Sequence, residues 1–219
     1  MNSGPDCIPP DIESAIEQAL AGLAPPGLIA GCRRIHAGDE QSLLPAEDKS
    51  IATRESRARA ASGAGRRIAH ELLERLGSRG RAVLRGRFGE PIWPPGVIGS
   101  IAHDDEFAVA VAGRSGTLRS VGVDVEPALP LPADLGPVVT TPRDRLGDLD
   151  AGMAGRILFA AKEAVYKAAF PLDGRVLGFE DIAVDLSTSE AVTSSGRRLT
   201  VRFATAPRML ALACTAWEG

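Results

Sequence analysis

The chain has 219 residues, of which 44% are hydrophobic and 24% are charged, and its formal net charge is −3. This composition is typical of an ordinary globular protein with one domain or two small halves. It excludes a membrane-spanning helix near the N-terminus, because the longest uncharged stretch there, residues 19–32, contains Pro25 and Pro26 and is shorter than the roughly 18 apolar residues needed.

The first half of the chain is predicted to begin with helices. Prolines at positions 9–10, 25–26 and 45 interrupt the opening third. Helices are expected over residues 46–61 and 64–76, and in the second of these apolar residues recur every three to four positions until Gly77. The run 86–99 is rich in Gly and Pro, so it is expected to form a shaped loop.

After this loop the hydrophobic period changes to two, which indicates strands. Residues 107–112 and 120–126 predict an antiparallel hairpin with a Gly-containing turn. Residues 127–150 are rich in Pro, Asp and Gly, so a mobile loop or lid is expected. The last third is predicted to contain one strong helix that Pro171 ends, followed by strands: 153–170, then 181–186, 199–204 and 209–216.

This order of elements predicts an α+β fold of two similar, pseudo-twofold-related halves, each with helices packed on a small antiparallel sheet. The predicted boundary divides the chain into residues 1–115 and 116–219, with one active site between the halves. Such an internal duplication favours a monomer. The acidic first 17 residues argue against a secretory signal, and Cys7, Cys32 and Cys214 lack disulfide or zinc spacing, so a cytoplasmic protein with reduced thiols is expected.

The basic residues are unevenly distributed. Residues 54–87 hold ten Arg and three acids, a net charge of +7, which leaves −10 for the rest of the chain. A basic patch on an acidic protein indicates a local anionic ligand, although a solvated helix face rich in Arg is an alternative. Lysine is rare, and two of the three lysines, Lys162 and Lys167, lie five residues apart, which suggests that a compact ammonium is needed there.

Three acidic residues form a candidate metal site. Asp124 and Glu126 are two residues apart on a predicted strand, so their side chains leave the same face. With Glu163 they could supply carboxylate oxygens to a hard divalent cation such as Mg²⁺. A water-facing strand and an ordinary surface pair between Glu163 and Lys167 are the alternatives. His103 can reach the same edge, where an imidazole would suit a phosphate.

Two motifs in this region resemble the paired signature of the 4'-phosphopantetheinyl transferases. Residues 122–126, Gly-Val-Asp-Val-Glu, are similar to G-[IV]-D-[IVA]-E, and Phe159 to Lys167 is similar to [WF]-x-x-K-E-x-x-x-K. Residues 89–100 and Ala64-Gly65-Arg66 further resemble the branch typified by enterobactin synthetase component D. Together these blocks cover about residues 57–180.

The resemblance implies two similar α+β halves with the active site in the cleft between them. The implied activity transfers 4'-phosphopantetheine from coenzyme A to a serine of an acyl or peptidyl carrier protein, and releases adenosine 3',5'-bisphosphate. The carrier would belong to a fatty-acid, polyketide or nonribosomal peptide synthase, including siderophore synthases.

The resemblance also implies roles for individual residues. Asp124, Glu126 and Glu163 match ligands of Mg²⁺, for which Mn²⁺ could substitute. Glu163 also matches the proposed base for the carrier serine, and Lys167 matches the group that neutralises the leaving group. The positions that match coenzyme A contacts are Arg57, Arg66, Gly89, Glu90, Pro91, Ala102, His103, Asp124, Lys162 and Lys167.

Some positions depart from the family pattern, and other functions stay open. Ala102 stands where Ser or Thr is usual, Phe88 stands where a cation is common, and Ala58 takes the place of one basic residue. One alternative is a metal-dependent nuclease or phosphodiesterase, although Pro127 follows Glu126 where restriction-type nucleases place a Glu-x-Lys motif. Another is a catalytically degenerate carrier-binding module. We expect no nucleic-acid partner.

Overall fold

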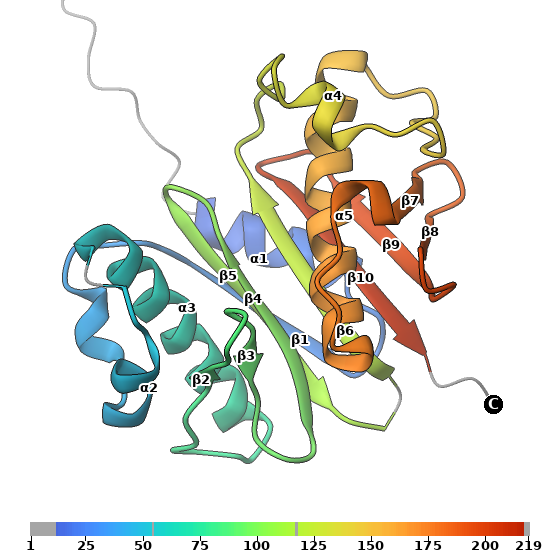
Figure 1. Ribbon diagram of the computed structural model, residues 1–219. Helices are drawn as coiled ribbons and strands as arrows, with labels where there is room; N and C mark the ends of the chain where they lie inside the picture. Colours follow the sequence, from blue (N-terminus) through green and yellow to red (C-terminus); the bar gives the residue numbers. More distant parts are fainter. Residues whose placement is uncertain (1–11, 54, 117, 217–219) are drawn as a thin grey trace, which may run out of the picture.

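The computed structural model describes residues 12–53, 55–116 and 118–216 (Figure 1). The helices are α1 (Ile12–Leu23), α2 (Pro45–Ser50), α3 (Ser56–Arg75), α4 (Gly136–Val139) and α5 (Ala151–Asp173), with the 3-10 helices η1 (Asp39–Ser42) and η2 (Phe179–Asp181). The strands are β1 (Leu28–Arg34), β2 (Leu84–Arg85), β3 (Pro91–Ile92), β4 (Val97–His103), β5 (Phe107–Arg114), β6 (Leu118–Glu126), β7 (Ile182–Asp185), β8 (Glu190–Thr193), β9 (Arg198–Ala204) and β10 (Met209–Ala216).

The strands form three antiparallel sheets, and each half of the chain supplies its own main sheet. The first has the order β1-β5-β4, the second β6-β10-β9-β8-β7, and the third is the short pair β2-β3. Helix α3 packs on the first sheet and α5 on the second (Figure 1). The predicted α+β fold is therefore confirmed, with helices on a small antiparallel sheet in each half.

The predicted hairpin between residues 107–112 and 120–126 is wrong. Strand β5 pairs with β4 and β1, whereas β6 pairs with β10 at the edge of the other sheet. The true partner of β5 is β4, which occupies the end of the run predicted as a loop. The sequence did not indicate this strand, because the Gly and Pro residues just before Val97 and Ile101 are typical of turns.

The helices also differ from the prediction at their ends. Helix α2 ends at Ser50, and α3 runs without a break through residues 62–64, where two separate helices were predicted. Gly63 is required inside α3 because a Cβ there would lie 2.1 Å from the carbonyl oxygen of Asp39 in η1. Helix α5 continues past Pro171 to Asp173, since a proline this close to the C-terminus disturbs only the last turn.

The segment 127–150 is attached to the second sheet and does not project as a free lid. It contains α4, and after it the N–H of Arg145 donates to the carbonyl of Val184 at 2.9 Å. The N–H of Leu186 in turn donates to the carbonyl of Arg145 at 2.8 Å. Both backbone bonds fasten the end of this segment beside β7.

A hydrophobic core joins the two main sheets. It contains Ile16 and Leu20 of α1, Val109 of β5, Val123 of β6 and Leu212 of β10, all fully buried. Val121, Val123 and Val125 lie on the core face of β6, as their alternation with the acids predicts. The halves therefore share one core. The proposed boundary at residue 115 stays a prediction.

Two further sequence expectations concern the membrane and the thiols. None of the helices in the described part of the chain has the length and apolarity that a membrane span requires. Cys32 and Cys214 are free thiols, and Cys7 lies outside the described residues. Burial, with nearby acids adding to it, raises the pKa of Cys32 to about 12, so this thiol stays protonated at neutral pH.

Candidate active site

The candidate site forms where α5 lies across the acid face of β6. Gly122 permits this approach, because a Cβ there would lie 2.0 Å from the carbonyl oxygen of Ala164 in α5. The backbone of α5 fills the space beside Gly122. The close contact brings the polar face of α5 onto Asp124 and Glu126, which the strand period places on one face of β6.

Asp124 is buried and paired with Lys167. The ammonium of Lys167 lies 2.6 Å from Asp124 Oδ1 and also donates to the carbonyl of Val123 at 3.3 Å. The second oxygen, Asp124 Oδ2, is buried and accepts no hydrogen bond from the described part of the protein. One side of this carboxylate is therefore available to a ligand that is not a protein side chain.

Glu126 and Glu163 complete the charged cluster. Arg156 Nη1 lies 2.6 Å from Glu126 Oε2, and Arg156 is seven residues before Glu163, two helical turns away on the same face of α5. Glu163 is half-buried and has no ion-pair partner among the residues that the structure describes. The face of α5 thus presents a cation, an acid and a cation to the two acids of β6.

The pKa values of all three acids are raised above their ordinary values. Burial raises the pKa of Asp124 in spite of the opposing charge of Lys167. Burial likewise raises the pKa values of Glu126 and Glu163, and the nearby Asp124 charge adds to both shifts. When all five groups are ionised, the cluster carries one excess negative charge, so a cation would relieve the repulsion.

The three carboxylates do not close a metal site in their present conformations. Within the described ranges, no group of three His, Cys, Asp or Glu side chains is arranged to hold one metal ion. The reason is visible in the pairs above, because Arg156 holds Glu126 and Lys167 holds Asp124. Hard oxygen donors and the unpaired Asp124 Oδ2 nevertheless match the chemistry that a Mg²⁺ ion requires.

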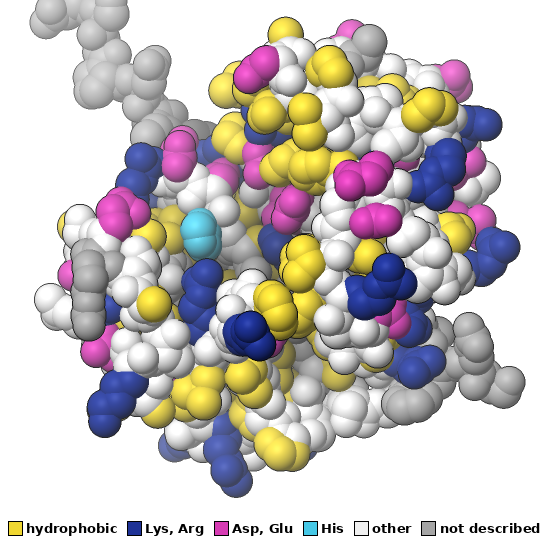
Figure 2. All heavy atoms as spheres, in the orientation of Figure 1, with side chains coloured by type: hydrophobic (Ala, Val, Ile, Leu, Met, Phe, Trp, Pro, Cys, Tyr) yellow, Lys and Arg dark blue, Asp and Glu magenta, His cyan; other side chains and the backbone are white. Residues whose placement is uncertain are grey.

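A cleft of about 390 Å³ lies beside Lys167, between the two halves. One wall is the loop at Gly89, Glu90 and Pro91, and the opposite wall is α5 with Tyr166 and Lys167. Figure 2 shows acidic side chains gathered in the middle of this face, between the two halves. The other residues that line the cleft come from β2, β4, β6, the loop between β2 and β4, and the end of α5: Arg85, Phe88, Trp93, Val97, Ile98, Gly99, Ser100, Ile101, Arg119, Ser120, Phe170 and Pro171.

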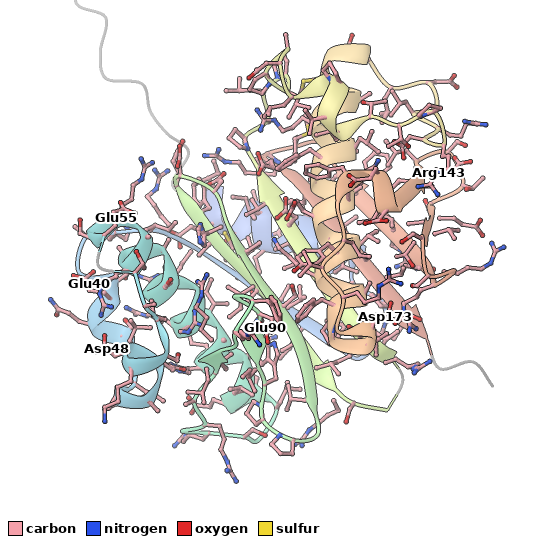
Figure 3. The ribbon with its side chains drawn as sticks, viewed as in Figure 1. Glu40, Asp48, Glu55, Glu90, Arg143 and Asp173 are labelled. Carbon is pink, nitrogen blue, oxygen red and sulfur yellow. The ribbon has the colours of Figure 1, made fainter. Side chains whose placement is uncertain are left out.

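The loop Gly89-Glu90-Pro91 is held in shape by hydrogen bonds that Glu90 accepts. Glu90, labelled in Figure 3, accepts the N–H of Phe88 at 2.9 Å with its carboxylate, and its backbone carbonyl accepts the N–H of Gly86 at 2.8 Å. Gly89 has φ +94°, a conformation that favours glycine. The Phe88 ring lies 5.5 Å from that of Phe170 on α5, so the loop touches both sides of the cleft.

His103 and Arg57 lie together in a second hollow. His103 ends β4 and lines a cavity of about 180 Å³ with Arg57, Asp104 and Asp105. Arg57 pairs with Asp105 at 2.9 Å, and both side chains are exposed. Partial burial lowers the pKa of His103 and the Lys167 charge lowers it further, which indicates that this ring is near the charged cluster.

Six predicted contacts with coenzyme A do not line the cleft: Arg57 and His103 line the second hollow, Asp124 is paired with Lys167, and Ala102, Arg66 and Lys162 are buried elsewhere. The side chain of Ala102 is buried in the core between the sheets. Arg66 is buried and donates to the carbonyls of Val83 at 3.0 Å and Ser62 at 3.4 Å. Lys162 has no exposed surface and donates to Val139, Asp144 and Phe179 inside the second half, so the prediction that its ammonium contacts a phosphate is not supported.

Several site residues were missed from the sequence. Arg156 could have been found, because it lies two helical turns before Glu163 and therefore shares its face. Trp93, Ser100 and Tyr166 lie within the blocks that resemble the family, but neither they nor Arg119 could be assigned to a cleft, since only the tertiary fold brings β4, β6 and α5 to one cavity. The Trp93 indole N–H is buried in this wall without an acceptor in the described residues.

Comparison with known proteins agrees with this arrangement. Residues 46–113 match the family model of the 4'-phosphopantetheinyl transferase N-terminal domain, and residues 120–212 match that of the 4'-phosphopantetheinyl transferase superfamily. The chain is 37% identical over 155 residues to the 4'-phosphopantetheinyl transferase Npt of Nocardia iowensis, which covers 69% of this chain and 70% of that protein.

The chain belongs to the 4'-phosphopantetheinyl transferase family.

Two other relatives of this transferase match different shares of its chain. The 4'-phosphopantetheinyl transferase PptT of Mycobacterium tuberculosis is 40% identical over 150 residues, 66% of each chain. Enterobactin synthase component D of Salmonella typhi is 34% identical over 111 residues, 48% of this chain and 45% of its own. The two family matches meet between residues 113 and 120, where β5 ends and β6 begins, so the charged cluster of β6 and α5 lies within the second match.

Proposed function

We propose that this transferase moves the 4'-phosphopantetheine group from coenzyme A to a serine of an acyl or peptidyl carrier protein, with a divalent cation, and releases adenosine 3',5'-bisphosphate. The observation that carries the proposal is the charged cluster beside the cleft between the two halves, which Lys167 lines. Asp124 and Glu126 face Glu163 and Lys167 there, and among the described residues one buried oxygen of Asp124 has no hydrogen-bond partner.

The residues of the cluster fit the reaction chemistry. The serine oxygen attacks the phosphorus that bears pantetheine, and the bond from that phosphorus to the bridging oxygen of the nucleotide breaks. Glu163 takes the serine proton. Burial destabilises its ionised form and so raises its pKa, which makes this carboxylate a stronger base. Lys167 is free to turn from Asp124 to the departing phosphate and neutralise its charge.

The walls of the cleft fit the nucleotide part of coenzyme A. A cavity of about 390 Å³ with aromatic side chains and one lysine suits a flat base joined to phosphates. Gly89, Glu90 and Pro91 form one wall, as the resemblance implies. His103 and Arg57 share the neighbouring hollow and supply donors for a further phosphate, whereas Ala102 has no side-chain donor and Lys162 directs its donors into the protein interior.

The proposed cation is Mg²⁺, with Mn²⁺ able to substitute. Asp124 Oδ2 would be one ligand, and Glu126 and Glu163 would join it after Glu126 leaves Arg156. Bound there, the ion would neutralise pyrophosphate oxygens and so lower the cost of gathering negative charge in the transition state. The excess negative charge of the cluster supports this assignment.

The acceptor and the setting are part of the same proposal. We infer that the transferase acts in the cytoplasm as a monomer, which is supported by the free thiols of Cys32 and Cys214 and by the core that its two halves share. The relatives named enterobactin synthase component D favour a peptidyl carrier of a siderophore synthase as one acceptor. Fatty-acid and polyketide carriers are the other classes to compare.

Mass spectrometry of a carrier protein tests the proposal directly. A purified apo-carrier of each class is incubated with this protein, coenzyme A and Mg²⁺. We expect one carrier class or more to gain the mass of one phosphopantetheine group, and EDTA to abolish the gain. A carrier mass that stays unchanged for every class, or a gain that EDTA does not affect, would contradict the transfer or the metal assignment respectively.

A further inference from the structure

Lys162 is the most deeply buried cation of the molecule's described part, and the reaction proposed above does not use it. Its side chain has no exposed surface, and neither has that of Asp144, 2.7 Å from its ammonium. The ammonium also donates to the carbonyls of Val139 at 2.9 Å and Phe179 at 3.0 Å. With all three protons donated inside the protein, none remains for a substrate phosphate.

The partners of Lys162 come from two separate segments, which α5 also contacts through Arg156 and Phe159. Val139 and Asp144 belong to the connection 127–150, and Phe179 begins η2 after α5. The carboxylate of Asp144 also accepts hydrogen bonds from the N–H groups of Thr141 at 2.7 Å and Val184 at 2.9 Å. Arg143, labelled in Figure 3, also donates to the carbonyl of Glu180. The Lys162–Asp144 pair therefore links both segments to α5 through buried hydrogen bonds.

The second of these segments flanks Glu163, in a cavity separate from the nucleotide cleft. Glu163 and Lys162 line a cavity of about 180 Å³ whose other wall is formed by residues 176–179 and Ile182. The connection 127–150 begins directly after Glu126 and exposes Leu129, Leu135 and Val138. Hydrophobic side chains gather over α4 on this face of the molecule (Figure 2). None of the three partners of Lys162 lines the nucleotide cleft.

We propose that Lys162 and Asp144 are a positioning pair that holds residues 136–144 and 176–182 in place for the carrier protein, and that Lys162 does not contact coenzyme A. The proposal rests on the proposed function, because it takes Glu163 as the group that the carrier serine must reach. The serine approaches Glu163 between the two segments. The nucleotide occupies the cleft on the other side of Tyr166, which lines both cavities.

Steady-state kinetics of three variants test this assignment. Lys162→Met removes the ammonium and keeps the chain length, Asp144→Asn removes the charge and keeps the shape, and the double variant removes both. We expect each single variant to raise the KM for apo-carrier about tenfold and to change the KM for coenzyme A less than twofold, since a shift of about 1 Å near a reacting group is enough for a large loss. The double variant should be no worse than the worse single one, because the two residues act as one unit.

Hydrogen exchange gives a second readout that needs no activity. In Asp144→Asn, amides of residues 136–146 and 178–184 should exchange at least tenfold faster, while amides of β4 and of the loop 86–91 stay unchanged. This variant keeps the measurement available if Lys162→Met fails to fold. Lys49→Met is the matched control, because Lys49 is exposed on α2, and it should behave like the unmodified protein.

Two results would overturn the assignment. A KM for coenzyme A that rises tenfold in Lys162→Met but not in Asp144→Asn would show that the ammonium serves a phosphate. Unchanged exchange in residues 136–146 of Asp144→Asn would show that the pair anchors nothing. An unmodified protein that modifies no carrier would instead refute the proposed function, and hydrogen exchange alone would then decide whether the pair fastens these segments.

Discussion

Single residues in the charged cluster differ in what they do because of small differences in position. Asp124 is a buried and Glu126 a half-buried acid on β6, and one pairs with a lysine and the other with an arginine. Glu163 has neither partner, and burial with the Asp124 charge raises its pKa. Of the three acids, Glu163 is therefore the one best suited to accept a proton.

The first prediction concerns Glu163. Glu163→Gln keeps the shape of the side chain but cannot accept the serine proton, so kcat should fall by about 10²- to 10⁴-fold, the range for loss of a general base. Stability should not fall, because Glu163 forms no ion pair within the described chain. Initial rates of carrier modification and thermal unfolding check both parts. Glu190→Gln, at an exposed position of β8, is the control, and an equal loss in both variants would remove Glu163 from the mechanism.

Glu47 gives a prediction about pH and stability, away from the charged cluster. This fully buried carboxylate faces His70 of α3 at 2.8 Å and accepts the N–H groups of Val83 at 2.7 Å and Leu44 at 2.9 Å. Burial alone would raise the pKa of Glu47, but these hydrogen bonds outweigh it and hold the pKa below its ordinary value of 4.5. The charge of Arg66 in α3 faces the same carboxylate.

The sign of the pH effect follows from that lowered pKa. The stabilisation that the ionised Glu47 carboxylate gives the fold is complete above pH 4.5, which is its pKa in the unfolded chain. This stabilisation is lost as the pH falls through the lower pKa that Glu47 has in the folded protein. At pH 7, Glu47→Gln should unfold with about 2 kcal/mol less free energy than the unmodified protein, the size of a hydrogen bond to a charged group. The difference should shrink on acidification in urea titrations, and a difference that is constant from pH 7 to pH 3 would contradict this account.

At the scale of elements, the site depends on two close contacts between segments far apart in the sequence. The first is α5 on β6 at Gly122, which sets the distance from Lys167 to Asp124. The second joins the turn after β4 to the turn before β10. Arg208 pairs there with Asp104 at 3.1 Å and Glu106 at 3.0 Å and stacks over Phe107, and Asp104 follows His103 directly.

Gly122→Ala tests the first contact. The new methyl group must push α5 away from β6, since it would otherwise lie 2.0 Å from the Ala164 carbonyl oxygen. We expect a loss of about 1–3 kcal/mol in the free energy of unfolding and a larger proportional loss of activity, because Lys167 moves with α5. Gly22→Ala in α1 is the control, because nothing lies within 4 Å of its Cβ, and it should be neutral or slightly stabilising. Full stability in Gly122→Ala would show that the helix can shift freely.

Arg208→Gln tests the second contact. Arg208 is buried, and its removal leaves Asp104 without its cation, so the free energy of unfolding should fall by about 3 kcal/mol. The KM for coenzyme A should rise, because the turn that positions His103 loses its support. Arg79→Gln, whose exposed pair with Glu74 should contribute less than about 1 kcal/mol, is the control in the same urea titration. A stability loss equal to that of Arg79→Gln would contradict the role of Arg208.

At the scale of the whole molecule, the two halves are one folding unit in spite of their separate sheets. Their shared core draws residues from α1, β5, β6 and β10, so either half made alone would expose the apolar face that it contributes to this core. Exposing that surface would cost more than an isolated half can recover, because small domains are only marginally stable.

Separating the halves tests this interpretation. Residues 1–115 made alone should lose native helix and strand content, which far-UV circular dichroism would detect, and should expose Trp93 to solvent, which tryptophan fluorescence would detect. The intact chain should unfold in one transition, with both methods giving the same midpoint. Two separate transitions, or a folded first half, would show that the core between the sheets is dispensable.

The chemistry of the site could be predicted from the sequence because it depends on local spacing. A strand places Asp124 and Glu126 on one face, and a helix places Glu163 and Lys167 one turn apart, whatever surrounds them. The same rules gave no information about which strand pairs with which. The predicted hairpin of β5 with β6 is wrong because pairing depends on contacts between residues far apart in the chain.

Only the tertiary structure decided what surrounds each charged side chain. Lys162 and Glu163 are neighbours in the sequence, but successive residues of a helix point about 100° apart, so they meet different environments. Glu163 faces the acids of β6, whereas Lys162 is buried against Asp144 and two carbonyl groups. The identity of a residue is local, but its burial and partners are set by elements that pack on it from elsewhere in the chain.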